Sequence, residues 1–377
     1  MSTRGTSTGR WAGVGVAGVI ILSLASIGAH ALLIPGFIRA ADASSRSTGA
    51  LSTPTTVQSG QGGTGSTTST SSPAATDLAP TAVPAMPAYD RACLRRDNPA
   101  TGAKIPANDP FGDDIADLGD KAELQRLYAV QSGALVPLDG LGAPRPCDEQ
   151  LWSLVKATAP TLLGHIDELL VFDADPDPAT GEFVIDGESA PKETAPDTFD
   201  DDRWRVSFAP NGLDRADLAW LVAHELAHVA SLNKDQMLSG VGADVCATWY
   251  TGTGCLLQDS FLRRYLSNTW DDSLWDDWRE ADGKSTEKAR RAAYQDFYDA
   301  HSDSFITDYA AWHPLEDFAE SFAMWCTYDV DEPDRANLPT ANRTDSGSKV
   351  AWFDAARRDI LPAFGPGCTM LREFAVS

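Results

Sequence analysis

Apolar positions beyond residue 120 follow two kinds of pattern. Three short runs predict strands, at 168–172, 183–186 and 204–208. Apolar residues at helical spacing predict helices on both sides of these runs, at 121–129, 149–163, 214–232, 258–266, 288–298 and 315–324. Because most of the helices follow the strands, the order predicts an α+β fold, with short antiparallel strands followed by a helical half.

The predicted helix at 214–232 differs from the others because its apolar residues go nearly all the way round its axis. They are Leu218, Trp220, Leu221, Val222, Leu226, Val229 and Leu232. A helix with no polar face is expected in the interior of a protein. We therefore expect this helix to be buried.

The N-terminal part of the chain has a different composition. Residues 11–38 contain no Asp, Glu, Lys or Arg, and such a run is long enough to cross a bilayer. It predicts a transmembrane anchor behind a cytoplasmic segment, 1–10, or else a signal segment that is cleaved. Residues 39–88 are rich in Ser, Thr, Gly and Pro and predict a flexible stalk. The folded domain is then expected at 89–377.

Charge and cysteine content narrow the class of partner and the compartment. The net charge is −24, and a surface this acidic repels phosphate backbones, so we expect no nucleic-acid partner. All six cysteines follow the apolar run, which favours disulfides outside the cytoplasm, on a membrane-anchored or a secreted protein. Six cysteines allow 15 pairings, and proximity makes Cys246 with Cys255 the first expectation.

The motif that carries chemistry lies in the middle of the buried helix. It is His224-Glu225-Leu226-Ala227-His228, and the spacing of four places both imidazoles on one face, where they can bind one ion. Glu225 is rotated by about 100° from His224 and can take a proton from a water at the open side of the ion. The alternative is a pair of core histidines satisfied by hydrogen bonds. Three titratable side chains in an apolar helix are costly to bury, and a metal compensates all three.

Two histidines leave a tetrahedral zinc ion in need of a third protein ligand. A glycine three residues and a histidine six residues after His228 would supply it in one class of zinc peptidase, but Ser231 and Lys234 stand there. The predicted helix at 315–324 offers Glu316, with Glu320 one turn later to orient a histidine. Acids spaced in this way also occur on solvated helix faces. The missing ligand favours the metal role for Glu316.

The segment from Tyr309 to Phe322, with Trp312-His313-Pro314-Leu315-Glu316 inside it, resembles the lethal-factor-like clade of the gluzincin zinc peptidases. The resemblance covers about residues 200–330 and implies a zincin-like metallopeptidase domain. It further implies that Zn²⁺ is the cofactor, that Glu225 is the general base, and that Tyr309, seven residues before the glutamate ligand, stabilises the oxyanion. Peptides or proteins are then the expected substrates.

Three questions stay open at the level of sequence. Tyr309 can instead simply pack beside the helix of Glu316. Trp312-His313 stands where the family commonly has Thr-Asn, and His313 has three interpretations: a structural role, a substrate contact or a competing metal ligand. A zinc-containing binding or structural module without turnover is the alternative to an enzyme. Cleavage specificity and oligomeric state cannot be read from the sequence.

Overall fold

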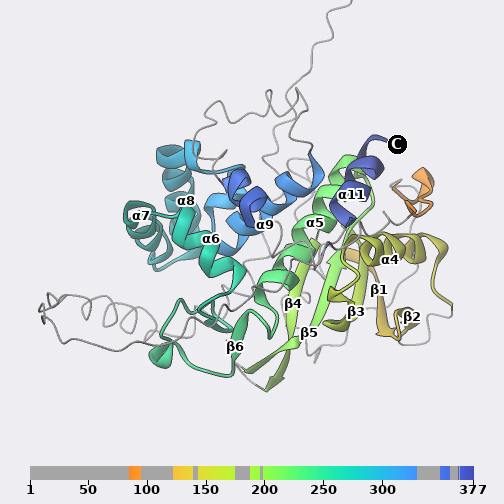
Figure 1. Ribbon diagram of the computed structural model, residues 1–377, viewed down its shortest axis with the longest axis horizontal. Coiled ribbons are helices and arrows are strands. Elements are labelled where there is room, and N and C mark those ends of the chain that lie inside the picture. The colour runs from red at the N-terminus through yellow and green to blue at the C-terminus, as the bar shows by residue number, and fades with distance from the viewer. Residues whose placement is uncertain are drawn as a thin grey trace, which may run out of the picture.

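A five-stranded sheet and a group of helices make up the part of the chain that the computed structural model describes (Figure 1). That part comprises residues 85–94, 122–138, 143–174, 187–195, 198–328, 349–356, 364 and 366–377. Its strands are β1 (Ala122–Gln131), β2 (Ala134–Pro137), β3 (Ile166–Ala174), β4 (Gly187–Ala195) and β5 (Thr198–Phe208). The α+β class is therefore confirmed.

The order of the sheet is β2-β1-β3-β5-β4, which leaves β4 at an edge. Most neighbours are antiparallel, but β3 and β5 pair in parallel, with Leu169 opposite Val206. The prediction of antiparallel strands was wrong for this pair. β4 comes between β3 and β5 in the sequence but lies beyond β5 in the sheet and pairs with it antiparallel, so β3 and β5 run in the same direction. The predicted strands at 168–172 and 204–208 are confirmed within β3 and β5, whereas 183–186 lies outside the described residues.

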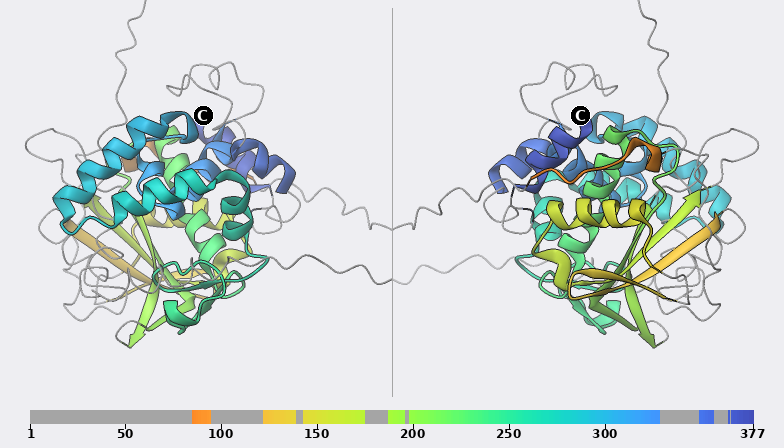
Figure 2. Two further views of the ribbon diagram at one scale, coloured as in Figure 1. Left: turned by 90° about the vertical axis from the view of Figure 1, so that its left-hand side faces the viewer. Right: turned by 90° about the vertical axis from the view of Figure 1, so that its right-hand side faces the viewer.

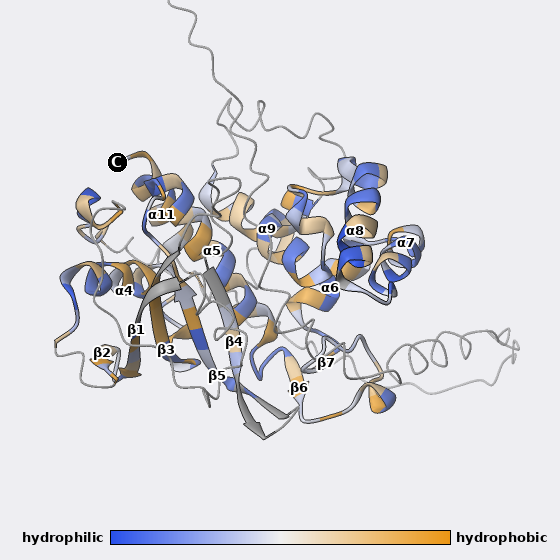
Figure 3. Ribbon diagram, turned by 180° about the vertical axis from the view of Figure 1, so that it is seen from behind, coloured by the Kyte–Doolittle hydropathy of each residue, from blue (hydrophilic) through white to orange (hydrophobic). Residues whose placement is uncertain are grey.

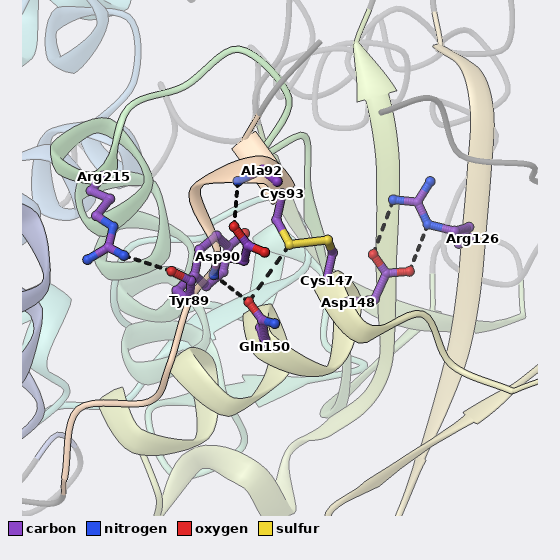
Figure 4. The surroundings of a disulfide bond; sticks show 9 residues. All are labelled: Tyr89, Asp90, Ala92, Cys93, Arg126, Cys147, Asp148, Gln150 and Arg215. Atoms are coloured by element: carbon purple, nitrogen blue, oxygen red, sulfur yellow. Dashed lines mark hydrogen bonds and ion pairs between the residues drawn. A yellow bond between two sulfur atoms is a disulfide. The ribbon is translucent and has the colours of Figure 1, made fainter. Parts of the chain in front are cut away.

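The predicted helix at 121–129 is wrong, since residues 122–129 belong to β1. Two side chains of β1 explain the error. Arg126 Nε donates to Asp148 Oδ2 of helix α4 (Pro146–Thr158) over 2.7 Å (Figure 4). Tyr128 Oη donates to the same oxygen over 2.5 Å. Tyr128 and Arg126 are both buried. A buried arginine whose partner is on another element hides the alternating pattern of a strand.

The helices lie on one side of the sheet, and α5 (Arg215–Leu232) is central among them (Figures 1 and 2). Asp214 caps α5, because its side chain accepts from the backbone N–H groups of Ala216 and Asp217. Every residue of α5 from Leu221 to Leu232 is buried. The helix packs between the sheet and α9 (Pro314–Thr327), so the expectation of a buried helix at 214–232 is confirmed.

Outside this central pair lie more polar helices, α6 (Phe261–Thr269), α7 (Asp272–Asp282) and α8 (Glu287–His301) (Figure 3). The predicted helices at 149–163, 258–266, 288–298 and 315–324 correspond to α4, α6, α8 and α9. The sequence patterns missed α7, the C-terminal helix α11 (Gly367–Val376), and the hairpin of β6 (Met237–Ser239) and β7 (Gly254–Leu256). Buried apolar side chains from Tyr89 to Phe374 form one continuous core.

All six cysteines form disulfides, as predicted. The pairs are Cys93–Cys147, Cys246–Cys255 and Cys326–Cys368. The first ties the short helix η1 (Arg91–Leu94) to α4 (Figure 4), and the last ties α9 to α11. The expected pairing of Cys246 with Cys255 is therefore confirmed, and it closes the loop between β6 and β7.

The predicted segments 1–10, 11–38 and nearly all of 39–88 lie outside the described residues. Within the described residues, no helix has the length and apolar character needed to cross a membrane.

Candidate metal centre

Three ligand atoms from two helices converge at the interface of α5 and α9. His224 Nε2 and His228 Nε2 lie 3.1 Å apart on α5. Glu316 Oε2 of α9 lies 3.2 Å from the first and 3.3 Å from the second. All three side chains are buried. The residues expected to bind the metal are thus brought together across 88 or more positions of sequence, and they could hold a metal ion.

The dimensions of this triangle fit a tetrahedral ion. Ligand atoms placed about 2.0 to 2.1 Å from zinc at tetrahedral angles are separated by about 3.3 Å. The three observed separations, 3.1, 3.2 and 3.3 Å, are close to that value. Three protein ligands leave the fourth position open. Four protein ligands would instead be expected at a closed, structural site.

The second carboxylate of α9, Glu320, determines which nitrogen of His224 carries a proton. Glu320 Oε1 accepts from His224 Nδ1 over 2.7 Å and from Trp220 Nε1 over 3.1 Å. Its Oε2 accepts from Thr307 Oγ1 over 2.7 Å. When the ring of His224 is neutral, its hydrogen is on Nδ1 and the lone pair of Nε2 faces the other two ligand atoms. Glu320 therefore occupies the position expected of an orienting acid.

The close approach of these groups shifts the pKa values of His224 and Glu316. Burial alone lowers the pKa of His224, but its hydrogen bonds to Glu316 and Glu320 raise that pKa well above the usual value. Burial disfavours the charged form of Glu316, yet the charges of His228 and His224 hold its pKa well below the usual range. Both shifts indicate a site that stabilises positive charge next to an ionised Glu316.

Glu225 is buried beside this triangle, and its surroundings leave one oxygen without a partner. Its Oε2 accepts no hydrogen bond from the described part of the chain. Burial raises the pKa of the Glu225 carboxyl, and the charges of His224 and His228 oppose this shift. Ser189 of β4 donates to the backbone carbonyl of Glu225 over 3.1 Å. An unsatisfied carboxylate oxygen is costly to bury, so a functional partner for it is expected.

Tyr309 lies against the first metal ligand. It begins the short helix η5 (Tyr309–Ala311), and its ring stacks on His224 with centroids 5.9 Å apart and an angle of 26°. Its side chain is half-buried. The position agrees with both interpretations of Tyr309, as an oxyanion donor and as a packing residue.

His313 caps the helix that carries Glu316. Its Nδ1 accepts from the backbone N–H of Leu315 over 3.2 Å, and its ring contacts Trp278 and Trp249 at 5.3 and 5.7 Å between centroids. Burial lowers the pKa of His313. Because Leu315 occupies Nδ1, that nitrogen serves the helix and not a metal. Of the three interpretations of His313, the described contacts therefore agree with the structural role.

A buried ion pair holds α9 at the residue next to Glu316. Asp317 accepts from Lys349 Nζ over 2.8 Å at each oxygen, from Trp270 Nε1 over 2.7 Å and from Tyr265 Oη over 3.0 Å. Asp317 and Lys349 are both almost fully buried. These contacts restrain the helix next to Glu316, which favours a fixed ligand geometry.

Sequence patterns missed four residues that surround the ligands, namely Ser189, Trp220, Thr307 and Lys349. Trp220 stands four residues before His224, so helical spacing alone places both on one face. The other three come from separate elements, and nothing in their local sequence connects them with the motif.

Comparisons with known proteins add no assignment. No family model, no curated protein and no solved structure matches this chain.

Proposed function

We propose that the chain is a zinc-dependent peptidase in which His224, His228 and Glu316 hold the metal and Glu225 is the general base. The convergence of Nε2, Nε2 and Oε2 at tetrahedral spacing carries this proposal. Glu225 has one buried oxygen with no hydrogen-bond partner among the described residues, which favours turnover over a purely structural role for the site.

The residues around the site have separate tasks in this proposal. Bound zinc would supply Lewis-acid chemistry and lower the pKa of a water to about 7. Glu225 would accept a proton from the attacking water and would then donate it to the leaving nitrogen. Glu320 keeps the hydrogen of His224 on Nδ1. Tyr309, stacked on His224, donates to the developing oxyanion.

A peptide is the substrate class that the sheet favours. Among the described strands β4 lies at an edge of the sheet, and the hydroxyl of Ser189 donates to the backbone carbonyl of Glu225. An extended peptide can add to such an edge through main-chain hydrogen bonds. A substrate aligned on β4 would lie along the strand that Ser189 connects to α5.

The three disulfides favour an oxidising compartment. We propose that the domain acts outside the cytoplasm, either attached to the cell membrane through residues 11–38 or released after cleavage of that segment.

Digestion of a broad peptide library by the purified full-length chain tests this function. Mass spectrometry should detect new peptide termini, a zinc chelator should abolish them, and added Zn²⁺ should restore them. A chain that carries zinc yet cleaves no peptide in the library would contradict the proposed activity and favour a zinc-containing binding module.

A further inference from the structure

The hydroxyl group of Thr307 connects Glu320 of α9 with the short helix η5. Thr307 Oγ1 donates to Glu320 Oε2 over 2.7 Å and accepts from the backbone N–H of Ala310 over 3.1 Å. A hydroxyl has one proton to donate. Since Ala310 points its own hydrogen at the oxygen, the proton of Thr307 is directed to Glu320.

One of these hydrogen bonds ends at a group that contacts His224, and the other ends at the neighbour of such a group. Glu320 accepts from His224 Nδ1 and so orients the imidazole. Ala310 belongs to η5, whose first residue, Tyr309, stacks on the same imidazole. Thr307 is therefore linked to the edge of the His224 ring through Glu320 and to its face through Tyr309.

The segment before Thr307 is fixed, which makes the hydroxyl a firm point of attachment. Phe305 is fully buried, with its ring 5.4 Å from that of Phe297 and 5.8 Å from that of Trp270. Ile306 is buried as well. With the backbone held two residues away, the hydroxyl of Thr307 has little freedom to follow a shift of Glu320 or of η5.

We propose that Thr307 is a positioning residue that sets the orientation of His224 and the place of Tyr309 at the same time. This inference rests on the proposed zinc peptidase function. The hydroxyl of Thr307 then contributes to both zinc affinity and kcat, and its contribution to kcat acts through Tyr309.

Two substitutions separate the hydroxyl from the shape of the side chain. Thr307→Val keeps the branched shape and loses both hydrogen bonds, whereas Thr307→Ser keeps the hydroxyl. Competition with a chelator should show zinc bound about 10-fold more weakly by Thr307→Val, the low end of the range for groups that orient metal ligands. With zinc saturating, kcat should fall by about 10-fold. Thr307→Ser should restore both values to near wild type.

Thr158→Val is the matched control, because Thr158 donates its hydroxyl to the carbonyl of Leu154 on α4, away from the ligands. It should leave zinc affinity and kcat unchanged. Equal defects in Thr307→Val and Thr307→Ser would overturn the proposal, since they would assign the effect to packing. Wild-type values in Thr307→Val would overturn it too.

A double-mutant cycle with Tyr309→Phe tests the path of the effect on kcat. If Thr307 acts through the phenol of Tyr309, the fold loss in kcat caused by Thr307→Val should be smaller in the Tyr309→Phe background than in wild type, by a factor of at least about 3. Trp220→Phe provides the contrast. This variant removes the indole N–H that donates to Glu320 and should weaken zinc binding. Its effect on kcat should be additive with that of Tyr309→Phe. An additive cycle for Thr307 would contradict the link to Tyr309.

The zinc measurement distinguishes failure of this inference from failure of the proposed function. A wild-type chain that binds zinc but cleaves no peptide contradicts the peptidase alone, and the zinc affinity of Thr307→Val still tests its link to His224. A wild-type chain that binds no zinc contradicts both.

Discussion

The Nε2 atoms of His224 and His228 lie 3.1 Å apart and face the same carboxylate oxygen of Glu316. Two neutral imidazoles share such a separation only if one donates to the other. Glu320 takes the hydrogen of His224 at Nδ1, so Nε2 of a neutral His224 cannot be the donor. A cation between the three atoms, a second proton on His224, or a hydrogen on Nε2 of His228 accounts for the short separation. The proposed function follows from the first solution.

Replacement of Glu316 tests whether the third ligand is correctly assigned. Glu316→Gln keeps the size of the side chain and removes its charge, so zinc affinity should fall by more than about 100-fold, beyond the loss seen for orienting residues. Glu373→Gln on the exposed side of α11 is the control and should bind zinc like wild type. Elemental analysis after dialysis measures both. Full zinc occupancy in Glu316→Gln would rule out this ligand.

Tyr309→Phe tests the oxyanion role. Loss of a single donor that acts only in the transition state should lower kcat by about 10² to 10³, with KM and zinc content little changed. Tyr298→Phe, a half-buried tyrosine of α8, is the matched control. If Tyr309 only packs against His224, the phenylalanine variant should turn over at the wild-type rate.

The titration of His224 predicts how zinc affects stability at different pH values. Despite burial, hydrogen bonds to Glu316 and Glu320 raise the pKa of His224 well above 6.5 in the folded, metal-free protein. The resulting stabilisation is fully present below the unfolded pKa and is lost as the pH rises through the folded pKa. Zinc-bound His224 has no such proton to lose. The increase in Tm on adding zinc should therefore be larger at about pH 9 than at about pH 6. An increase that shrinks as the pH rises would contradict this account.

The disulfide between Cys326 and Cys368 should stabilise the helix of Glu316. It closes 42 residues between α9 and α11, and a loop of that length corresponds to about 4 kcal/mol in the chain-entropy description. The double variant Cys326→Ala, Cys368→Ala should lose stability of that order in denaturant unfolding.

The three disulfides together predict a mass difference: the non-reduced wild-type chain should be about 6 Da lighter than the reduced one. Free thiols in the folded, exported protein would refute the oxidised state.

Much of the site was predictable because its pattern is local. His224, Glu225 and His228 lie within two turns of a helix whose apolar residues go round the axis, and that combination alone predicts a buried metal-binding helix. Glu316 required a further step, a missing ligand and a second helix with paired acids. The structure places all four side chains at one interface.

The errors have a common physical origin in contacts between distant residues. β1 was predicted as a helix because Arg126, which faces the interior, is satisfied by Asp148 of another element. Likewise, Thr307 contacts Glu320 from a separate loop, and Lys349 reaches Asp317 across 32 positions. A buried polar residue whose partner is distant in sequence looks like a surface residue, so the local pattern of apolar and polar positions does not reveal it.

The Glu225→Gln variant tests the central claim most directly, through zinc content and peptide cleavage measured on one sample. An amide cannot accept a proton from water, so cleavage should fall by about 10² to 10⁴, the range for a positioned general base. Zinc content should stay at about one ion per chain, because Glu225 is not among the three converging ligands. Wild-type cleavage by this variant, with zinc bound, would contradict the account.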